Sequence, residues 1–231
     1  MRRFVPPILV VLTLSGLASV ASARSPKDPV LRSRPADVSL ARSLLLAKAD
    51  FPPGFRDAGP DRSGSGNFDC NEVAQPDLHR LVMTADVSSH DFQRTDPVTG
   101  FTQVSTEATL FVNATEAQAG IAWLANLPRA KLSDCFAAAF RAGLPKTAKM
   151  AGFHLTALQR AIGPLHIYVW ELQLRVQRNG AWIPVDFVIG DYRRGRGIAT
   201  LVALQVGGAL DPSLTTQLSR TFGTRLATAA I

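Results

Sequence analysis

Alternating apolar and polar positions are densest in residues 164–207, where three such runs are separated by two short turns. The first run places a mostly apolar set of side chains on one strand face: His166, Tyr168, Trp170, Leu172, Leu174 and Val176. Because strand side chains alternate between two faces, this pattern predicts a half-buried strand. Asn179-Gly180 follows and predicts a hairpin turn, since both central residues of the favoured turn need positive φ. Residues 181–192 and 198–206 predict two further strands, which complete an antiparallel meander.

The same patterns predict the remaining elements. Residues 81–88 and 101–112 predict a hairpin, and residues 153–157 predict another strand. Asp37 is expected to cap the first helix. Helices are predicted at residues 37–49, 115–127, 128–143 and 212–231. Strands in hairpins, with helices grouped between them, predict an α+β fold with an antiparallel sheet of about five to six strands and the helices packed on one face.

The first residues have the three parts of a secretory signal. Residues 1–3 are Met-Arg-Arg, residues 4–17 are mostly apolar, and residues 21–23 form an Ala-Ser-Ala cleavage site. We expect cleavage after Ala23 rather than retention as a membrane anchor, because the uninterrupted apolar core is about ten residues and a spanning helix needs about 20. The expected parts are a signal peptide at 1–23, a disordered leader at 24–36 and a single α+β domain at 37–231. This organisation predicts a secreted or envelope-associated protein with no transmembrane span after cleavage.

Charge and cysteine content bear on the possible partners of the protein and on its covalent cross-links. The formal net charge of +7 is spread along the chain, which permits attraction to anionic surfaces but does not indicate a nucleic-acid partner. Cys70 and Cys135 are the two cysteines, and in an exported chain they predict one disulfide. The alternative is a catalytic thiol, which would require a neighbouring base and an unpaired second cysteine.

Recognisable catalytic and cofactor motifs are absent from the sequence. His79, His90, His154 and His166 are too widely spaced to predict a metal site. The string at residues 62–67 lacks the first glycine of a serine-hydrolase elbow and follows no predicted strand. No phosphate-binding glycine loop or dinucleotide fingerprint occurs either, so we expect no cofactor. These patterns favour binding over catalysis.

Two groups of residues are candidates for ligand contact. His166, Tyr168 and Trp170 share one strand face and are predicted to line a ligand pocket, although a histidine at the edge of a core is an alternative for His166. Arg193, Arg194 and Arg196 lie at a hairpin tip and are candidates for anion contact, because guanidinium groups bind phosphate and carboxylate bidentately. The alternative is a solvated turn whose charges discourage pairing between sheet edges.

The layout of the chain resembles a known class of exported domains. A Leu-rich helix runs into Ala-Asp-Phe-Pro-Pro-Gly-Phe at residues 49–55, and Cys70 follows. A strand-helix unit then ends with Cys135 on the inner face of a helix, and Gly-Arg-Gly at residues 195–197 precedes a strand and a final Asp-Pro helix. This combination is similar to small actinobacterial exported proteins, including lipoproteins and the extracytoplasmic sensor domains of the PknH type of receptor kinase.

The resemblance covers roughly residues 37–229. It implies a curved antiparallel sheet with disulfide-tethered helices around a cleft. This chain differs from the sensor domains in having two cysteines instead of four, and it has neither a kinase domain nor a cysteine at the cleavage site for lipid attachment. The resemblance therefore carries no functional residue over to this chain.

These observations favour a secreted, non-catalytic domain that binds a small or lipidic ligand, or a cell-envelope component, in a cleft beside the sheet. One alternative is an exported hydrolase whose site is assembled from residues distant in sequence. A second alternative is a protein-protein adaptor at the envelope, which would carry a large exposed apolar patch.

Overall fold

The computed structural model describes residues 27–60, 77–144 and 147–231. The signal peptide expected at residues 1–23 lies outside the described residues, so its cleavage stays a prediction. Within the described ranges, no helix is both long enough and apolar enough to span a membrane.

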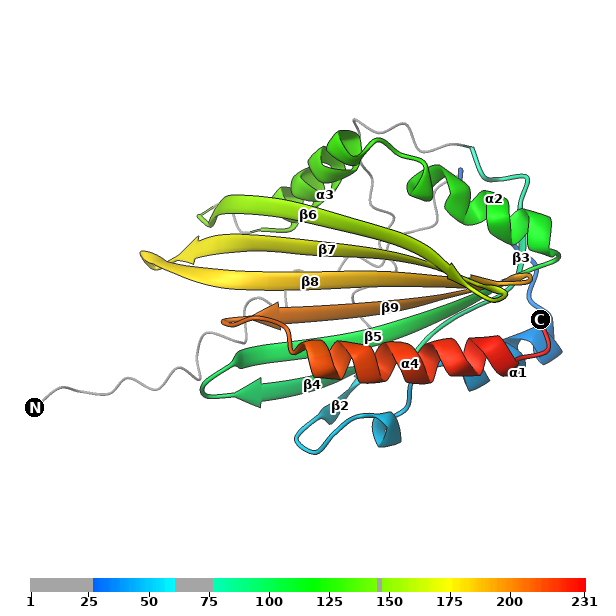
Figure 1. Cartoon of the computed structure of the whole chain (residues 1–231), viewed down its shortest axis with the longest axis horizontal. Coiled ribbons are helices and arrows are strands. Elements are labelled where there is room, and N and C mark those ends of the chain that lie inside the picture. Colours follow the sequence, from blue (N-terminus) through cyan, green and yellow to red (C-terminus); the bar gives the residue numbers. More distant parts are fainter. Residues whose placement is uncertain (1–26, 61–76, 145–146) are drawn as a thin grey trace, which may run out of the picture.

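The elements follow one another from a short first strand to a long last helix (Figure 1). In chain order they are β1 (Val30–Leu31), α1 (Pro35–Leu44), the 3-10 helix η3 (Lys48–Asp50), β2 (Arg56–Pro60), β3 (Val82–Ser88), β4 (His90–Asp96), β5 (Gly100–Phe111), α2 (Ala114–Ala125), α3 (Arg129–Gly143), β6 (Lys149–Ile162), β7 (Leu165–Arg178), β8 (Ala181–Arg194), β9 (Gly197–Val206) and α4 (Pro212–Thr228).

The described strands form one large mixed sheet. Its order is β1-β3-β5-β9-β8-β7-β6, with β4 also paired to β5 and β2 paired to β4. All pairs are antiparallel except β1 with β3. The expected antiparallel sheet of about five to six strands is therefore wrong, because the sheet is mixed and has nine strands. The extra strands β1, β2 and β4 are short. β4 is mostly polar, and β2 (Arg-Asp-Ala-Gly-Pro) has no alternating apolar residues. Apolar alternation therefore does not mark them, and pairing with neighbouring strands makes them strands.

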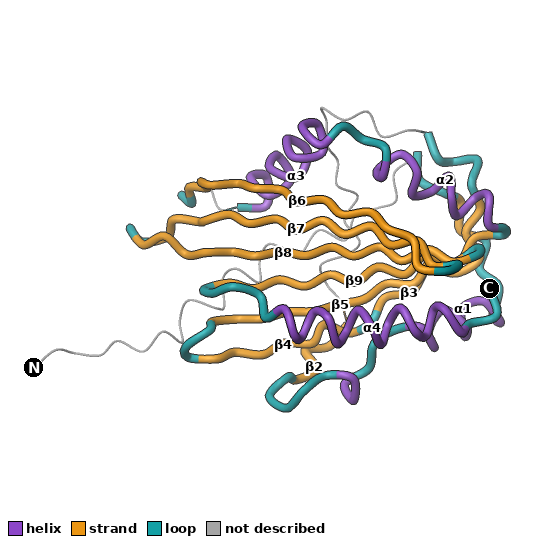
Figure 2. The backbone as a smooth tube through the Cα atoms, viewed as in Figure 1, coloured by secondary structure: helices purple, strands orange, loops and turns teal. Residues whose placement is uncertain are grey.

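Helices cover both faces of the sheet, which corrects the expectation that they pack on one face (Figures 1 and 2). On the first face, Phe222 of α4 makes an edge-to-face contact with Tyr192 of β8, with ring centroids 5.7 Å apart. On the second face, Leu132 and Phe136 of α3 pack in one core cluster with Trp170 of β7. Successive side chains of β7 and β8 therefore pack into two separate cores, one under α4 and one under α2 and α3.

The disulfide expected as part of the fold involves one cysteine that lies outside the described residues. Cys135 is buried in α3, 2% exposed, beside Trp123 and Leu127. Cys70 lies outside the described residues. The pairing of these two cysteines therefore stays a prediction.

The segment expected to be a leader contributes to the fold. Val30–Leu31 pairs in parallel with β3, and α1 begins at Pro35. Asp37, which was expected to cap the helix, instead lies in its first turn and is buried. Its carboxylate accepts hydrogen bonds from the two terminal nitrogens of Arg196, at 2.6 and 3.0 Å. Arg196 also donates to the Phe111 carbonyl at 3.1 Å, so one side chain joins the β8–β9 turn to α1 and β5.

We expect Asp37→Asn to lower the free energy of unfolding at pH 7 by about 2 kcal/mol, because it leaves the partly buried Arg196 without its carboxylate. The bond from Arg196 holds the pKa of Asp37 below its ordinary value of 3.8. The stabilisation is therefore complete above that pH and is lost as the pH falls through the lower pKa of the folded protein. Urea unfolding followed by circular dichroism measures the difference. Asp134→Asn, at an exposed position of α3, is the control, and equal losses in both variants would contradict the assignment.

Candidate ligand-binding pocket

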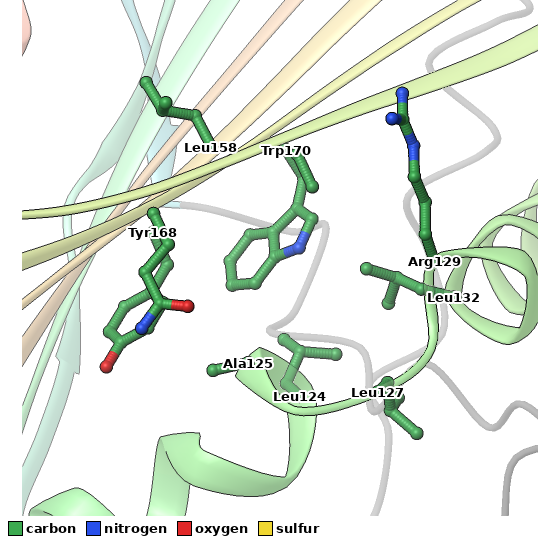
Figure 3. A pocket seen from close by; sticks show the side chains of 10 residues that line it. Leu124, Ala125, Leu127, Arg129, Leu132, Leu158, Tyr168 and Trp170 are labelled. Carbon is green, nitrogen blue, oxygen red and sulfur yellow. The ribbon is translucent and has the colours of Figure 1, made fainter.

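A pocket of about 180 Å³ lies between the α2–α3 turn and strands β6 and β7 (Figure 3). One wall comes from the helices and is mostly aliphatic, and the opposite wall carries two aromatic rings. The lining residues are Leu124, Ala125, Leu127, Arg129, Leu132, Ala157, Leu158, Gln159, Tyr168 and Trp170. Residues 157–159 are exposed, so strand β6 forms the rim of the pocket.

Tyr168 and Trp170 form the aromatic wall. They lie two positions apart on β7 and therefore share a sheet face. Their rings are stacked, with centroids 6.4 Å apart and planes at 12°, and the residues are 4% and 3% exposed. Each residue also carries one hydrogen-bonding group, the Tyr168 hydroxyl and the Trp170 indole N–H.

The α2–α3 turn forms the aliphatic wall. Leu124 is near the end of α2, Leu127 lies in the turn, and Leu132 is near the start of α3. Arg129 ties this turn to the sheet, because its Nε and a terminal nitrogen donate to the Leu155 carbonyl of β6, at 3.2 and 2.6 Å. The guanidinium thus joins the start of α3 to β6 at the rim of the pocket.

A row of polar residues crosses the same sheet face beside the pocket. Strand pairing places Tyr168 opposite Asp191, Asp191 opposite Thr200, and Thr200 opposite Glu107. The Thr200 hydroxyl donates to the Asp191 carboxylate at 2.6 Å. Burial raises the pKa of Asp191 to about 6, because removal from water disfavours the charged carboxylate. A group that titrates near neutral pH therefore adjoins the tyrosine of the pocket.

Two of the three residues predicted to face a ligand, Tyr168 and Trp170, line the pocket, and His166 does not. His166 is partly buried two positions before Tyr168, opposite Arg193 of β8 and Ala161 of β6. The role of all three in ligand binding stays a proposal.

The three arginines predicted as an anion contact point to different parts of the structure. Arg196 binds Asp37 of α1, and Arg194 donates to the Leu226 carbonyl of α4 at 3.2 Å. Arg193 is 9% exposed and points to the face of α2 and α3, and its Nε has no hydrogen-bond partner among the described residues. The hairpin tip is therefore attached to α1 and α4 through two of these side chains.

Two other histidines form exposed pairs with aspartates. His79 contacts Asp77, and His90 of β4 contacts Asp57 of β2 at 2.8 Å. In the ranges that the structure describes, no group of three or more His, Cys, Asp or Glu residues is placed to hold a metal ion.

The aliphatic wall and Asp191 were missed by the sequence analysis. Leu124, Leu127 and Leu132 fall within the two helices predicted at residues 115–127 and 128–143, and their spacing gives no sign that the turn between these helices forms one wall of a pocket. Asp191 carries a weak signal, because it is an acidic residue at the end of a strongly apolar run. Only the pairing of β7, β8 and β9 places it beside Tyr168.

Comparison with known proteins finds distant similarities. No protein-family model matches the chain, and no curated protein matches it. The chain is similar to the extracellular domain of PknH from Mycobacterium tuberculosis, with 10% identity and a TM-score of 0.41 over 85% of this chain and 99% of that one. It is also similar to LpqN, involved in cell envelope biogenesis of Mycobacterium tuberculosis, with 15% identity and a TM-score of 0.26 over 57% of this chain and 65% of that one. The resemblance to the PknH type of domain is confirmed at this low level of similarity.

We expect Asp191→Asn to raise the free energy of unfolding at pH 7 by about 3 kcal/mol, because the amide removes the cost of a buried charge and still accepts from Thr200. Between the ordinary pKa of 3.8 and the folded value of about 6, the folded protein binds more protons at Asp191 than the unfolded protein does. The parent protein should therefore lose stability as the pH rises through this window, and the variant should not. Urea unfolding at several pH values from 4 to 7 checks this, and parallel profiles would contradict it.

Proposed function

We propose that this protein is an extracytoplasmic, non-catalytic binding domain that holds an apolar group of a small molecule, lipid or envelope component in the pocket beside β6 and β7. The observation that supports this most directly is a pocket with a stacked aromatic pair on one wall and leucines on the other. Ligand sites in proteins are typically apolar and aromatic cavities with a few placed polar groups. The signal pattern in residues 1–23 supports the location.

The size of the pocket sets the size of the bound group. An apolar cavity of about 150 Å³ holds benzene, and this pocket measures about 180 Å³. The bound group is therefore one ring or a short aliphatic chain. A larger ligand would place such a group in the pocket and extend over the β6 rim.

The polar groups in the pocket support binding rather than catalysis. Arg129 is the one charged residue among those that line it, and its guanidinium is bonded to the Leu155 carbonyl. The pocket thus lacks the pair of groups that acid–base or nucleophilic catalysis uses. The Tyr168 hydroxyl and the Trp170 indole N–H are suited to orient a ligand by hydrogen bonds.

A ring-sized probe should bind in the pocket. We expect 4-fluorobenzyl alcohol to bind with a dissociation constant of about 1 mM or lower, observed as broadening and displacement of its ¹⁹F resonance. Ala125→Phe should weaken binding at least about tenfold, because the added ring occupies the pocket. Ala138→Phe is the matched control, since Ala138 lies on the exposed side of α3 away from the lining, and it should bind as the parent does. No binding by the parent, or equal binding by both variants, would overturn the proposal.

A further inference from the structure

We propose that the exposed edge of β6 binds an extended peptide as an additional strand, and that a large apolar side chain of this peptide enters the pocket between acidic flanking residues. The inference rests on the proposed function, because it names the class of ligand that brings an apolar group to the same pocket. Addition of a strand to a free sheet edge is a general mode of peptide recognition, in which backbone bonds give affinity and pockets give specificity.

The backbone of β6 has a free side. β6 is the end strand of the sheet and pairs only with β7 among the described strands. The Leu155 carbonyl points outward, because it accepts from Arg129, the first residue of α3. Backbone groups alternate in direction along a strand, so the N–H and C=O groups of Ala157, Gln159 and Ala161 also point outward.

The register of the other strands leads to the same assignment. The Pro184 carbonyl of β8 accepts from Gly207, on the β9 side, so alternate residues of β8, including Val185, bond toward β7. Val185 pairs with Leu174, so the even-numbered residues of β7 bond toward β8 and the odd-numbered ones bond toward β6. Val169 of β7 pairs with Leu158, so the backbone groups of Leu158 and of the other even-numbered residues of β6 point inward, toward β7. The odd-numbered residues from 155 to 161 are therefore the outward ones.

This stretch lacks the devices that normally protect an edge. Sheet edges are usually blocked by proline, charges, bulges or a covering element. Every residue from 156 to 162 is exposed. The stretch contains no proline and one charged residue, Arg160, and the irregularity of β6 lies earlier, between Ala151 and His154. A seven-residue segment can therefore accept a partner strand.

The pocket and the edge are continuous. Ala157 and Gln159 belong to the outward edge and also line the pocket, so a strand paired there would have its side chains on that face directed into the pocket. Its alternate side chains would face the other side of the sheet, where Leu158 and Ile162 are 52% and 55% exposed. Figure 3 shows Leu158 on the opposite side of β6 from Tyr168 and Trp170. Both faces of the added strand would thus have apolar contacts.

The charged side chains near the β6 edge indicate which kind of peptide would bind there. Arg129, which bonds to Leu155, and Arg160 are exposed at the stretch, and Glu171 of β7, which pairs with Thr156, is an exposed acidic residue beside it. The balance is basic, which favours a peptide with acidic residues. Pairing of two β6 edges would bring the basic groups of two copies together, which is unfavourable.

Amide hydrogen exchange measured by NMR tests the backbone pairing directly. The probe is the peptide acetyl-Glu-Thr-Val-Phe-Val-Thr-Glu-amide, added to the purified protein at saturating concentration. We expect protection of the Ala157, Gln159 and Ala161 amides to rise at least about tenfold. The amides of Leu158 and Arg160 are already bonded to β7, so they serve as internal controls and should not change.

Variants of the peptide and protein separate the contributions. Binding should be lost when the Phe is replaced by Ser or the Glu residues by Lys. Ala161→Pro removes one outward N–H without removing a bond to β7, and Ala161 is not among the residues that line the pocket. The variant should therefore weaken peptide binding at least about tenfold and leave 4-fluorobenzyl alcohol binding unchanged. If the alcohol binds but the peptide does not protect the outward amides, the peptide proposal is wrong and the pocket proposal stands. If neither binds, both fail.

A second copy of the chain is the competing occupant of the edge. Protection of the three outward amides that rises with protein concentration in the absence of peptide, together with dimer formation in sedimentation, would overturn the peptide proposal. A monomer whose outward amides exchange freely until peptide is added supports it.

Discussion

The register of the β7–β8 hairpin is the constraint on which the rest of the structure depends. Asn179 and Gly180 have φ values of 50° and 82°, which confirms the predicted turn with two positive φ angles and fixes the pairing of the two longest strands of the meander. A slip of one residue would move Tyr168 and Trp170 to the face covered by α4. Because helices cover both faces of the sheet, such a slip would disrupt two cores at once. The position of the aromatic wall is therefore set by a local turn.

The two faces of the sheet differ in how completely they are covered. Under α4, Leu218, Phe222 and Leu226 are fully buried in the largest core cluster. The other face carries the pocket and the polar row that includes Asp191 and Thr200. Its two helices meet in a turn that is held to β6 by the Arg129 side chain, so coverage ends at the edge of the sheet. Binding features collect on this face because its coverage is incomplete, whereas the α4 face supplies stability.

Arg129 contacts both the pocket and the edge of β6. By donating to the Leu155 carbonyl, it satisfies one outward backbone group and positions the α2–α3 turn. Beyond this bond, the edge continues without a partner among the described strands. The same contact that builds the aliphatic wall thus marks where the free edge begins. A ligand that uses the pocket therefore meets exposed backbone donors and acceptors at its rim.

The sequence by itself determined the meander of β7, β8 and β9, and it identified Tyr168 and Trp170 as neighbours on one face, because alternation and the Asn-Gly turn are local properties. The tertiary structure decided the rest. The short strands β1, β2 and β4 form through pairing, and the placement of helices on both faces depends on which side each crossover takes. Arg196 illustrates the reason: it was a candidate anion contact, but its partner Asp37 is 159 positions away. The helix wall of the pocket and the burial of Asp191 likewise arise from contacts between distant segments, which no local pattern encodes.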